Sequence, residues 1–275
     1  MLRQKRSSNL RQWNHELAKT LRKTPKLPDG QRVLWREEVG STNRVALDLA
    51  EAGEPSGLWM VADRQTLGRG RAKRVWISEP GNLFASYLTS FSSPGYELHG
   101  LPLVAGLALH DAVEKIFDEA STSFPLGLKW PNDLTCYGAK IGGILIETTS
   151  SPDANSYPVV IGFGLNLKSA PMVPDQATTS VVAQGVDVIL EHALEFLGES
   201  LQHWLNVWQA GSNIDAVCAA WMERGIPLGS RLKVRGRSGA PVEGRFAGLN
   251  KEGALLLDRA GEIMTVTFGD VDMLN

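Results

Sequence analysis

Residues 158–167, PVVIGFGLNL, carry the pattern that most restricts how this chain folds. In a strand, successive side chains point to opposite faces, so every second residue here shares a face. One face holds Val159, Ile161, Phe163, Leu165 and Leu167, and the other holds Val160, Gly162, Gly164 and Asn166. The first face requires a hydrophobic core. Glycine weakens a strand interior, so on the second face we expect a close neighbour, either a ligand or the backbone of another element.

The rest of the chain predicts an α/β protein. We expect strands over 32–39, 58–63, 82–91, 126–130 and 139–148, and helices over 42–52, 101–120, 186–209 and 213–224. From Gly229 onward, short strand-like runs alternate with Gly, Asn and Asp turns, which is typical of a small β-barrel. The predicted divisions are a basic arm over 1–30, a large domain over 31–226 and a small β domain over 227–275.

Composition excludes several classes of protein. The 275 residues have a net charge of −2, which argues against a protein devoted to coating nucleic acid. Two cysteines make no disulfide framework, so a reducing cytoplasm is expected. No apolar run approaches the roughly 18 residues that would cross a bilayer, so no membrane partner is expected. Residues 1–27 are basic, and Leu10, Trp13, Leu17 and Leu21 share one face of an expected short helix there.

Residues 68–74, GRGRAKR, place four positive charges beside two glycines, and we call them the arginine loop. Like charges this close repel one another, and glycine makes ordering the backbone more costly. The segment is either an ordinary solvated loop or a site for a multiply charged anion. In the second case, Gly68 and Gly70 let backbone N–H groups approach the anion, while Arg69, Arg71 and Arg74 supply forked donors. The chain has no P-loop and no dinucleotide-binding glycine motif.

Two lysines lie on otherwise apolar strands. Lys129 in LGLKWPNDL is next to the end of a strand, because Pro131 removes a ladder donor, and it either reaches solvent or meets an anion. Lys140 in GAKIGGILIET precedes the pair Gly142 and Gly143, which either packs against a helix or opens the sheet to a ligand. Together with the glycine-bearing strand, these elements predict a pocket for a flat apolar molecule that bears an anion, beside a polyphosphate.

The combination of motifs resembles the biotin protein ligases. STN at 41–43, QTLGRGR with Trp76, KWPNDL, GAKIGGILIE and GFGLNL occur in that family's order and approximate spacing, from about residue 33 to the C-terminus. The resemblance implies an α/β (α+β) catalytic domain with a mixed sheet flanked by helices, and an SH3-like C-terminal barrel. It also implies that Mg·ATP activates biotin to biotinyl-5′-AMP, and that a lysine of a biotin carboxyl carrier protein domain then receives the biotin.

The resemblance also implies roles for particular residues. Ser41, Thr42, Asn43 and Gln65 resemble the groups that line the biotin pocket and hydrogen-bond the ureido ring. Arg69, Gly70 and Arg71 match the loop that faces the biotin carboxylate and the phosphates. Lys129 matches the lysine that contacts the carboxylate and the α-phosphate, and with Arg71 it is the expected catalytic pair. The nucleotide side is expected to include Gly68, Arg74, Lys140, Gly143 and Asn166, and the Mg²⁺ ligands are not predicted.

The sequence departs from the family pattern in two places. Lys73 occupies a position where the family has glycine, and if that position needs a positive φ, lysine resists the conformation. Family members that double as repressors carry a winged helix-turn-helix, which the 30-residue arm is too short to supply. We therefore expect no sequence-specific DNA binding.

Other functions give different expectations. A lipoate- or octanoate-type ligase or transferase of the same superfamily would not need the polar groups that face a ureido ring. A non-enzymatic nucleic-acid-binding protein would use the basic arm, with an affinity that depends on salt. Whether the protein forms a homodimer is left open by the sequence.

Overall fold

The computed structural model describes residues 23–92, 98–150, 155–236 and 240–274. Most of the basic arm, including the expected helix around Leu10, lies outside these residues. None of the helices in the described ranges is long and apolar enough to cross a membrane.

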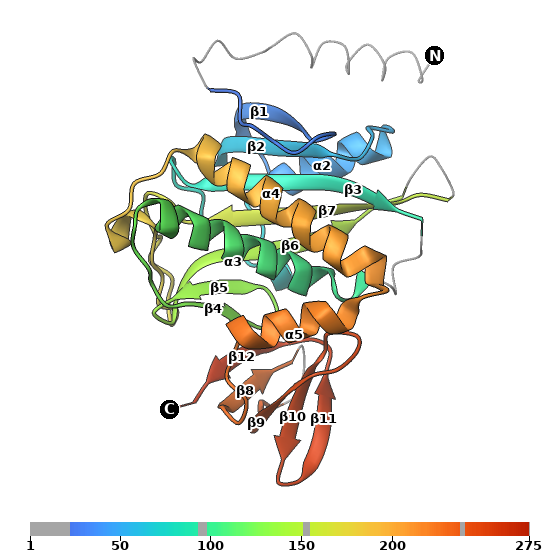
Figure 1. Ribbon diagram of the computed structural model, residues 1–275, viewed down its shortest axis with the longest axis vertical. Coiled ribbons are helices and arrows are strands. Elements are labelled where there is room, and N and C mark those ends of the chain that lie inside the picture. Colours follow the sequence, from blue (N-terminus) through green and yellow to red (C-terminus); the bar gives the residue numbers. More distant parts are fainter. Residues whose placement is uncertain (1–22, 93–97, 151–154, 237–239, 275) are drawn as a thin grey trace.

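The larger part is built on a seven-stranded sheet in the order β1-β2-β3-β7-β6-β5-β4 (Figure 1). Its strands are β1 (Arg32–Val39), β2 (Leu58–Gln65), β3 (Leu83–Phe91), β4 (Leu126–Lys129), β5 (Asp133–Cys136), β6 (Ala139–Thr148) and β7 (Tyr157–Leu165). Strands β1 and β2 are parallel, and helix α2 (Thr42–Glu51) supplies the crossover that a parallel pair needs. The other neighbouring pairs are antiparallel, so the sheet is mixed, as predicted.

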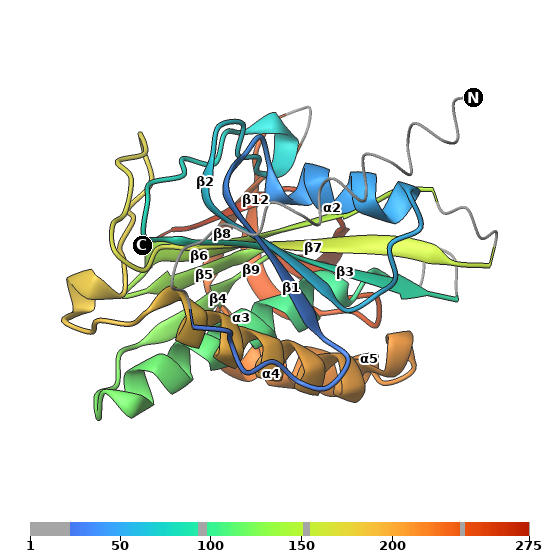
Figure 2. The ribbon, with the colours of Figure 1, turned by 90° about the horizontal axis from the view of Figure 1, so that it is seen from above.

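Helices cover both faces of this sheet (Figure 2). Helix α2 packs on one face, while α3 (Leu101–Glu119), α4 (Leu190–Trp208) and α5 (Ile214–Arg224) lie on the other. The alternation in β7 produces this arrangement. Val159, Ile161, Phe163 and Leu165 belong to the large core beneath α3 and α4, whereas Val160 belongs to a smaller core beneath α2. The predicted core face is therefore confirmed.

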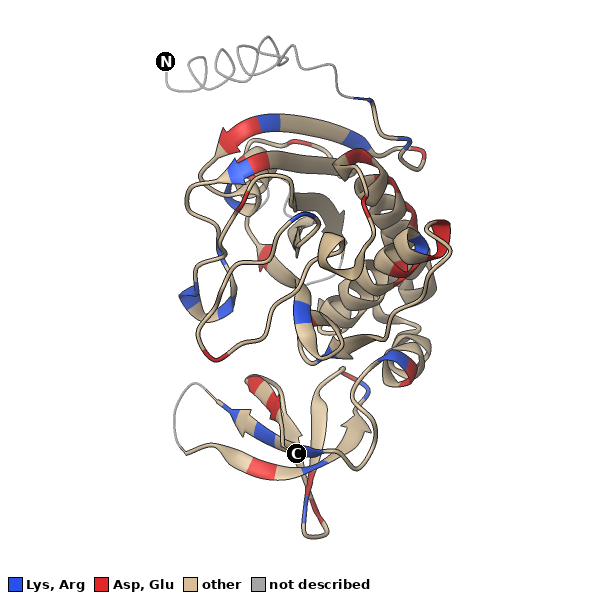
Figure 3. Cartoon of the chain, turned by 90° about the vertical axis from the view of Figure 1, so that its left-hand side faces the viewer, with Lys and Arg blue, Asp and Glu red and all other residues tan. Residues whose placement is uncertain are grey.

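The C-terminal part is a five-stranded antiparallel sheet in the order β11-β10-β9-β8-β12. Its strands are β8 (Arg231–Arg235), β9 (Val242–Leu249), β10 (Leu255–Arg259), β11 (Glu262–Val266) and β12 (Asp270–Met273). Figure 3 shows basic and acidic segments interspersed on both sheets. The predicted class, a mixed α/β sheet with helices and a small C-terminal β domain, is confirmed. The predicted boundary at 227 falls between α5 and β8.

Candidate active site

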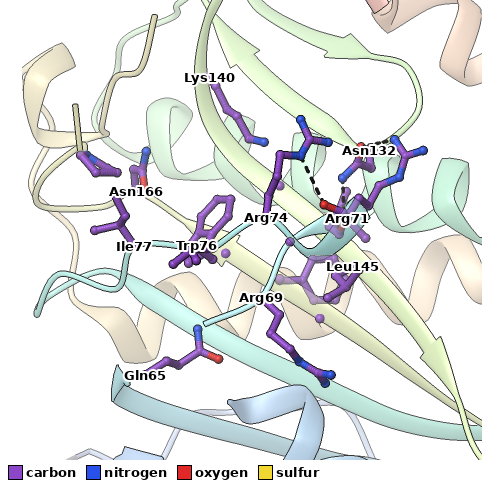
Figure 4. Close-up of a pocket in the computed structure, with 18 of the residues that line it drawn as sticks. Gln65, Arg69, Arg71, Arg74, Trp76, Ile77, Asn132, Lys140, Leu145 and Asn166 are labelled. Carbon is purple, nitrogen blue, oxygen red and sulfur yellow. Dashed lines mark hydrogen bonds between the residues drawn. The ribbon is translucent and has the colours of Figure 1, made fainter. Parts of the chain in front are cut away.

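A pocket opens on the α2 side of the large sheet, where the arginine loop passes over β6 and β7 (Figure 4). Its lining comes from the start of α2, the end of β2, the loop, the two strands and a segment near 171–178. The sequence-predicted site residues that line it are Ser41, Thr42, Asn43, Gln65, Arg69, Gly70, Arg71, Arg74, Lys140, Gly143 and Asn166. Gly68 and Lys129 are not among the lining residues.

The two glycines of β7 admit protein side chains rather than the ligand or backbone that the sequence suggested. A Cβ atom on Gly162 would lie 2.1 Å from Asn43 Oδ1, and one on Gly164 would lie 2.4 Å from the ring of Trp76. Gly143 on β6 faces the same ring, with a would-be Cβ contact of 3.0 Å. Asn43 and Trp76 therefore occupy the groove that the glycines leave.

A network of hydrogen bonds lies beneath one end of the pocket. Ser86 of β3, 0% exposed, donates to Asn43 Oδ1 at 2.6 Å and lies 2.7 Å from Thr42 Oγ1. The Asn43 amide donates to the Leu145 carbonyl at 3.1 Å and to Glu147 Oε2 at 2.8 Å. We call Asn43, Ser86, Gly162 and Gly164 the pocket floor. Its polar groups are paired before any ligand arrives, so their orientation is fixed.

The network continues to the far side of the arginine loop. Thr42 donates from its backbone N–H to Gln65 Oε1 at 2.9 Å, and Gln65 Nε2 donates to Ser78 Oγ at 3.2 Å. Ser41 occupies the N-cap position of α2, yet its side chain makes no capping hydrogen bond. Ser41 lines the pocket instead.

The arginine loop folds back on itself as a tight turn. Gly70 N–H donates to Arg74 O at 2.7 Å, and Trp76 N–H donates to Gly68 O at 2.9 Å. Between them Ala72 and Lys73 have φ values of 52° and 62°. Lys73, where the family has glycine, therefore does lie in the left-handed region, in which a lysine is strained and a glycine would not be.

Arg71 and Arg74 reach the C-terminal sheet. Arg74 Nη2 lies 2.8 Å from Asp270 Oδ1, and Arg71 Nη1 lies 3.8 Å from the same oxygen. Arg71 also donates to the Gly269 carbonyl at 3.3 Å and to Asn132 Oδ1 at 3.0 Å. The Arg71 guanidinium carbon stands 5.0 Å from the centroid of the Phe268 ring. These contacts join the loop to the start of β12.

The two predicted lysines have different surroundings. Lys140 lines the pocket, lies 2.6 Å from Asp133 Oδ1, and its Nζ is 5.4 Å from the centre of the Trp76 ring. Lys129 pairs instead with Asp272 of the C-terminal sheet at 3.9 Å. In this structure the pocket lining therefore includes Lys140 and not Lys129.

Two buried polar atoms at the other end of the pocket have no hydrogen-bond partner. They are Asn166 Oδ1 and Trp76 Nε1, and Asn166 is 3% exposed. The other end of the Asn166 amide donates to Thr179 O at 3.0 Å, which fixes its orientation. Because unpaired buried acceptors are costly, Asn166 Oδ1 is a candidate to accept a ligand N–H.

Sequence reasoning missed several residues of this site. Ser86 lies on the strand predicted over 82–91 and was given no role, and Glu147 appeared only as the end of the motif GAKIGGILIE. Asn132 was quoted within KWPNDL without a role, although its Nδ2 donates to Ile144 O at 2.8 Å. The segment with Pro171, Val173, Gln176 and Thr178 carried no recognised motif.

One cluster away from the pocket has ligand-type side chains. Potential ligand atoms of His110, Asp111 and Glu114 lie within 4.8 Å of one another. Asp111 already accepts a hydrogen bond from Trp204 Nε1 at 2.7 Å and lies 3.3 Å from Arg224 Nε. This cluster is therefore accounted for as a link between helices.

Comparison with known proteins identifies the family. The Biotin/lipoate A/B protein ligase family matches residues 35–166, and the biotin protein ligase C terminal domain matches residues 228–274. The biotin–[acetyl-CoA-carboxylase] ligase of Mycobacterium tuberculosis is 32% identical over 250 residues, covering 86% of this chain and 89% of the relative. That of Paracoccus denitrificans is 34% identical over 224 residues, covering 79% of this chain and 90% of the relative.

The chain belongs to the biotin protein ligase family. The solved structure of biotin protein ligase from Aquifex aeolicus in complex with biotin and ATP extends the likeness to the fold. It is 28% identical, has a TM-score of 0.71, and the match covers 88% of this chain and 98% of that one. The resemblance seen in the sequence motifs is confirmed, and so is the assignment of the C-terminal sheet to the biotin protein ligase C-terminal domain.

Proposed function

We propose that this member of the biotin protein ligase family activates biotin with ATP and transfers it to a lysine of a biotin carboxyl carrier protein domain. In the first step, a biotin carboxylate oxygen attacks the α-phosphorus of ATP. The bond from that phosphorus to the bridging oxygen breaks, and pyrophosphate leaves. In the second step, a neutral lysine amine attacks the carbonyl carbon of biotinyl-5′-AMP, an amide forms, the nitrogen loses a proton and AMP leaves.

The observation that carries this proposal is that one pocket has two chemically different ends. The end beside α2 is polar and buried, and hydrogen bonds hold its side chains in place, which suits a rigid polar ring. The other end has the arginine loop and Lys140, which suit anions. Acyl adenylation needs an acid and a triphosphate to be held together, and most of its catalysis is positioning and charge stabilisation.

On the biotin side, Ser41, Thr42 and Gln65 are proposed to meet the ureido ring. Asn43 has no N–H group left to donate to this ring, because its N–H groups donate to Leu145 and Glu147. Asn43 is therefore proposed to shape the pocket from beneath. This assignment sharpens the sequence prediction, in which all four residues had the same role.

On the nucleotide side, Asn166 Oδ1 is proposed to accept from an exocyclic amine of the base, since among the described lining residues it is a buried acceptor that lacks a partner. Gly143 keeps the surface of β6 low at this end of the pocket. Arg71 and Arg74 are proposed to face the phosphates after leaving Asp270, and Gly68 to allow the close turn of the loop.

The identity of the catalytic lysine can be tested within this site. Lys129 is the residue implied by the motif KWPNDL, whereas Lys140 lines the pocket and Lys129 pairs with Asp272. A cation near the attacking carboxylate would offset its repulsion from the α-phosphate. Replacing each lysine by alanine separately measures which one supplies that charge.

ATP is expected as its magnesium complex, in which the ion neutralises phosphate charge. The lining residues in the described part of the chain include no carboxylate. We propose that the ion is held chiefly by the phosphates of ATP.

The decisive experiment is exchange of labelled pyrophosphate into ATP, with biotin and separately with lipoate or octanoate. Exchange with biotin alone is the expected result. Exchange with lipoate alone would replace the proposal by the lipoate-type alternative, and exchange with neither acid would refute it. The second step is measured as biotin incorporated into a carrier domain and into the same domain with its acceptor lysine changed to arginine.

Two further expectations belong to this proposal. The protein is expected to act in the cytoplasm and to lack sequence-specific DNA binding. Its oligomeric state, whether monomer or homodimer, can be measured by analytical ultracentrifugation with and without biotin and ATP. A salt-dependent DNA affinity lost on removal of residues 1–27 would favour the nucleic-acid-binding alternative.

A further inference from the structure

Glu147, near the end of β6, contacts two parts of the site at once. Its Oε2 atom accepts from Asn43 Nδ2 at 2.8 Å and from Arg69 Nη2 at 2.8 Å. Asn43 is 4% exposed and belongs to the pocket floor, whereas Arg69 belongs to the arginine loop. A single carboxylate oxygen therefore ties the floor to the loop.

The contact separates Arg69 from the other two arginines. Arg71 and Arg74 approach Asp270 of the C-terminal sheet, while Arg69 pairs with Glu147 of the large sheet. In Figure 4 the guanidinium of Arg69 points away from those of Arg71 and Arg74. Glu147 balances the charge of Arg69 at the proposed biotin end. The arginines of the loop therefore lie at different ends of the pocket.

Glu147 also fixes the orientation of the Asn43 amide. An ionised carboxylate accepts hydrogen bonds and donates none, so the NH₂ group of Asn43 must face it. The amide oxygen then faces Ser86, which donates to it at 2.6 Å. A flipped amide would place an oxygen against both Glu147 and the Leu145 carbonyl. The hydrogen bonds of the floor consequently have one favourable arrangement.

We propose that Glu147 is a positioning residue for the biotin end of the pocket, which holds the Asn43 amide in one orientation and keeps Arg69 as a wall of that end. Arg69 then serves biotin binding, and the triphosphate relies on Arg71 and Arg74. The proposal rests on the proposed biotin ligase function. It differs from the expectation that Arg69 and Arg71 both face the biotin carboxylate and the phosphates.

The test compares the isosteric variant Glu147→Gln with Arg69→Gln and with the double variant. Biotin binding without ATP is measured by calorimetry, and KM for biotin and for ATP by pyrophosphate exchange. Because a hydrogen bond to a charged group is lost, each single variant is expected to weaken biotin binding about tenfold, with KM for ATP within about twofold of the wild type. The double variant is expected to match the singles, because both remove one shared interaction.

The matched control is the surface pair Arg64 and Glu38, which lie 3.1 Å apart on β2 and β1. Glu38→Gln removes the same kind of ion pair away from the pocket and should leave both KM values unchanged. A rise in KM for ATP rather than for biotin in the Glu147 and Arg69 variants would overturn the proposal. Full additivity of the two changes would overturn it as well.

A second measurement does not depend on biotin. Trypsin must draw an arginine side chain out of its contacts before it cleaves, so pairing with Glu147 protects the bond after Arg69. Glu147→Gln is expected to accelerate cleavage after Arg69 several-fold, by mass spectrometry, while Glu38→Gln does not. Unchanged cleavage would contradict the proposed tie. A wild-type protein that fails to bind biotin would instead count against the proposed function.

Discussion

The pocket floor and the arginine loop meet at one site but are stabilised differently. In the floor, Ser86 is 0% exposed and Asn43 4%, and their polar atoms are joined by hydrogen bonds. In the loop, the Arg74 side chain is 57% exposed and its partner Asp270 40%. The floor is therefore fixed by burial, whereas the loop depends on charges that salt and ligands can compete for.

This difference assigns separate tasks to the two regions. A buried group that loses its partner costs the full desolvation of that group, so changes in the floor should reduce stability and ligand binding together. Exposed ion pairs contribute little to folding, so changes in the loop should reduce the reaction and leave the fold intact. The loop can then rearrange around an anion without disturbing the sheet that holds the other substrate.

The largest expected effect follows from Asn43→Ala. This change leaves Ser86, Glu147 and the Leu145 carbonyl without their common partner. We expect the free energy of unfolding to fall by roughly 3 kcal/mol. Biotin-dependent pyrophosphate exchange should fall at least about a hundredfold, because the floor loses its geometry. Urea unfolding and exchange kinetics measure the two effects on the same preparation.

Asn43→Asp is the matched variant, because its size is unchanged. It places a second carboxylate against Glu147, so it should be no better than alanine at neutral pH. An Asn43→Ala protein with wild-type stability and exchange would show that the floor is not the fixed part of the site.

Arg71→Ala should affect the reaction more than the fold. Arg71 joins Asn132, the Gly269 carbonyl and the Phe268 ring, and its side chain is 17% exposed. We expect kcat for exchange to fall about a hundredfold, as for loss of a transition-state donor. The free energy of unfolding should fall by about 1–2 kcal/mol, less than for Asn43→Ala, because Arg71 is only partly buried.

Arg71→Lys keeps the charge and loses the forked donor, so it should recover only part of the rate. If Arg71→Ala destabilised the protein as strongly as Asn43→Ala, the proposed division of tasks between floor and loop would be wrong.

The floor shows what could be predicted from sequence. The alternation in 158–167 identified both the core face and the glycine face, because strand geometry alone fixes which side chains share a side. It did not identify what fills the groove. Asn43 and Trp76 come from distant segments, and only the strand order brings them over Gly162 and Gly164.

The loop shows where sequence reasoning stops. Its charges indicated an anion, but nothing local indicated that Glu147 and Asp270 would share them. Strand β5, Asp133–Cys136, was also missed, since a strand of four residues is too short to show a period. Lys129 was placed correctly on its strand, yet its contact with Asp272 depends on how the C-terminal sheet docks.

Asp270→Asn tests the ionic side of the comparison. Its carboxylate competes with phosphate oxygens for Arg71 and Arg74, so removing the charge should lower KM for ATP about twofold, with KM for biotin unchanged. The effect should disappear in about 1 M salt, where charges interact over only about 3 Å. Glu243→Gln, which removes the partner of Lys233 on the same sheet, is the control. A salt-independent effect would argue against an ionic contact.

The smallest effect on the reaction is expected for Asp111→Asn. This variant tests whether a partly buried polar group away from the pocket contributes to catalysis. Asp111 of α3 accepts from Trp204 of α4 and pairs with Arg224 of α5, away from the pocket. Burial by itself raises the pKa of Asp111, but hydrogen bonds with His110 and Trp204 and the charge of Arg224 outweigh it and lower the pKa below its ordinary value. A lowered pKa in the folded state means that the ionised group stabilises the fold above the unfolded pKa, and that this stabilisation is lost as the pH falls.

Asp111→Asn should therefore reduce the free energy of unfolding by about 1–2 kcal/mol at pH 7, and its difference from wild type should narrow below about pH 4. Pyrophosphate exchange should stay at the wild-type rate, and the exposed Asp118→Asn variant on the same helix should change neither quantity. Slower exchange in Asp111→Asn at unchanged folded fraction would show that the helical layer contributes to the site, and the contrast between floor and loop would then be incomplete.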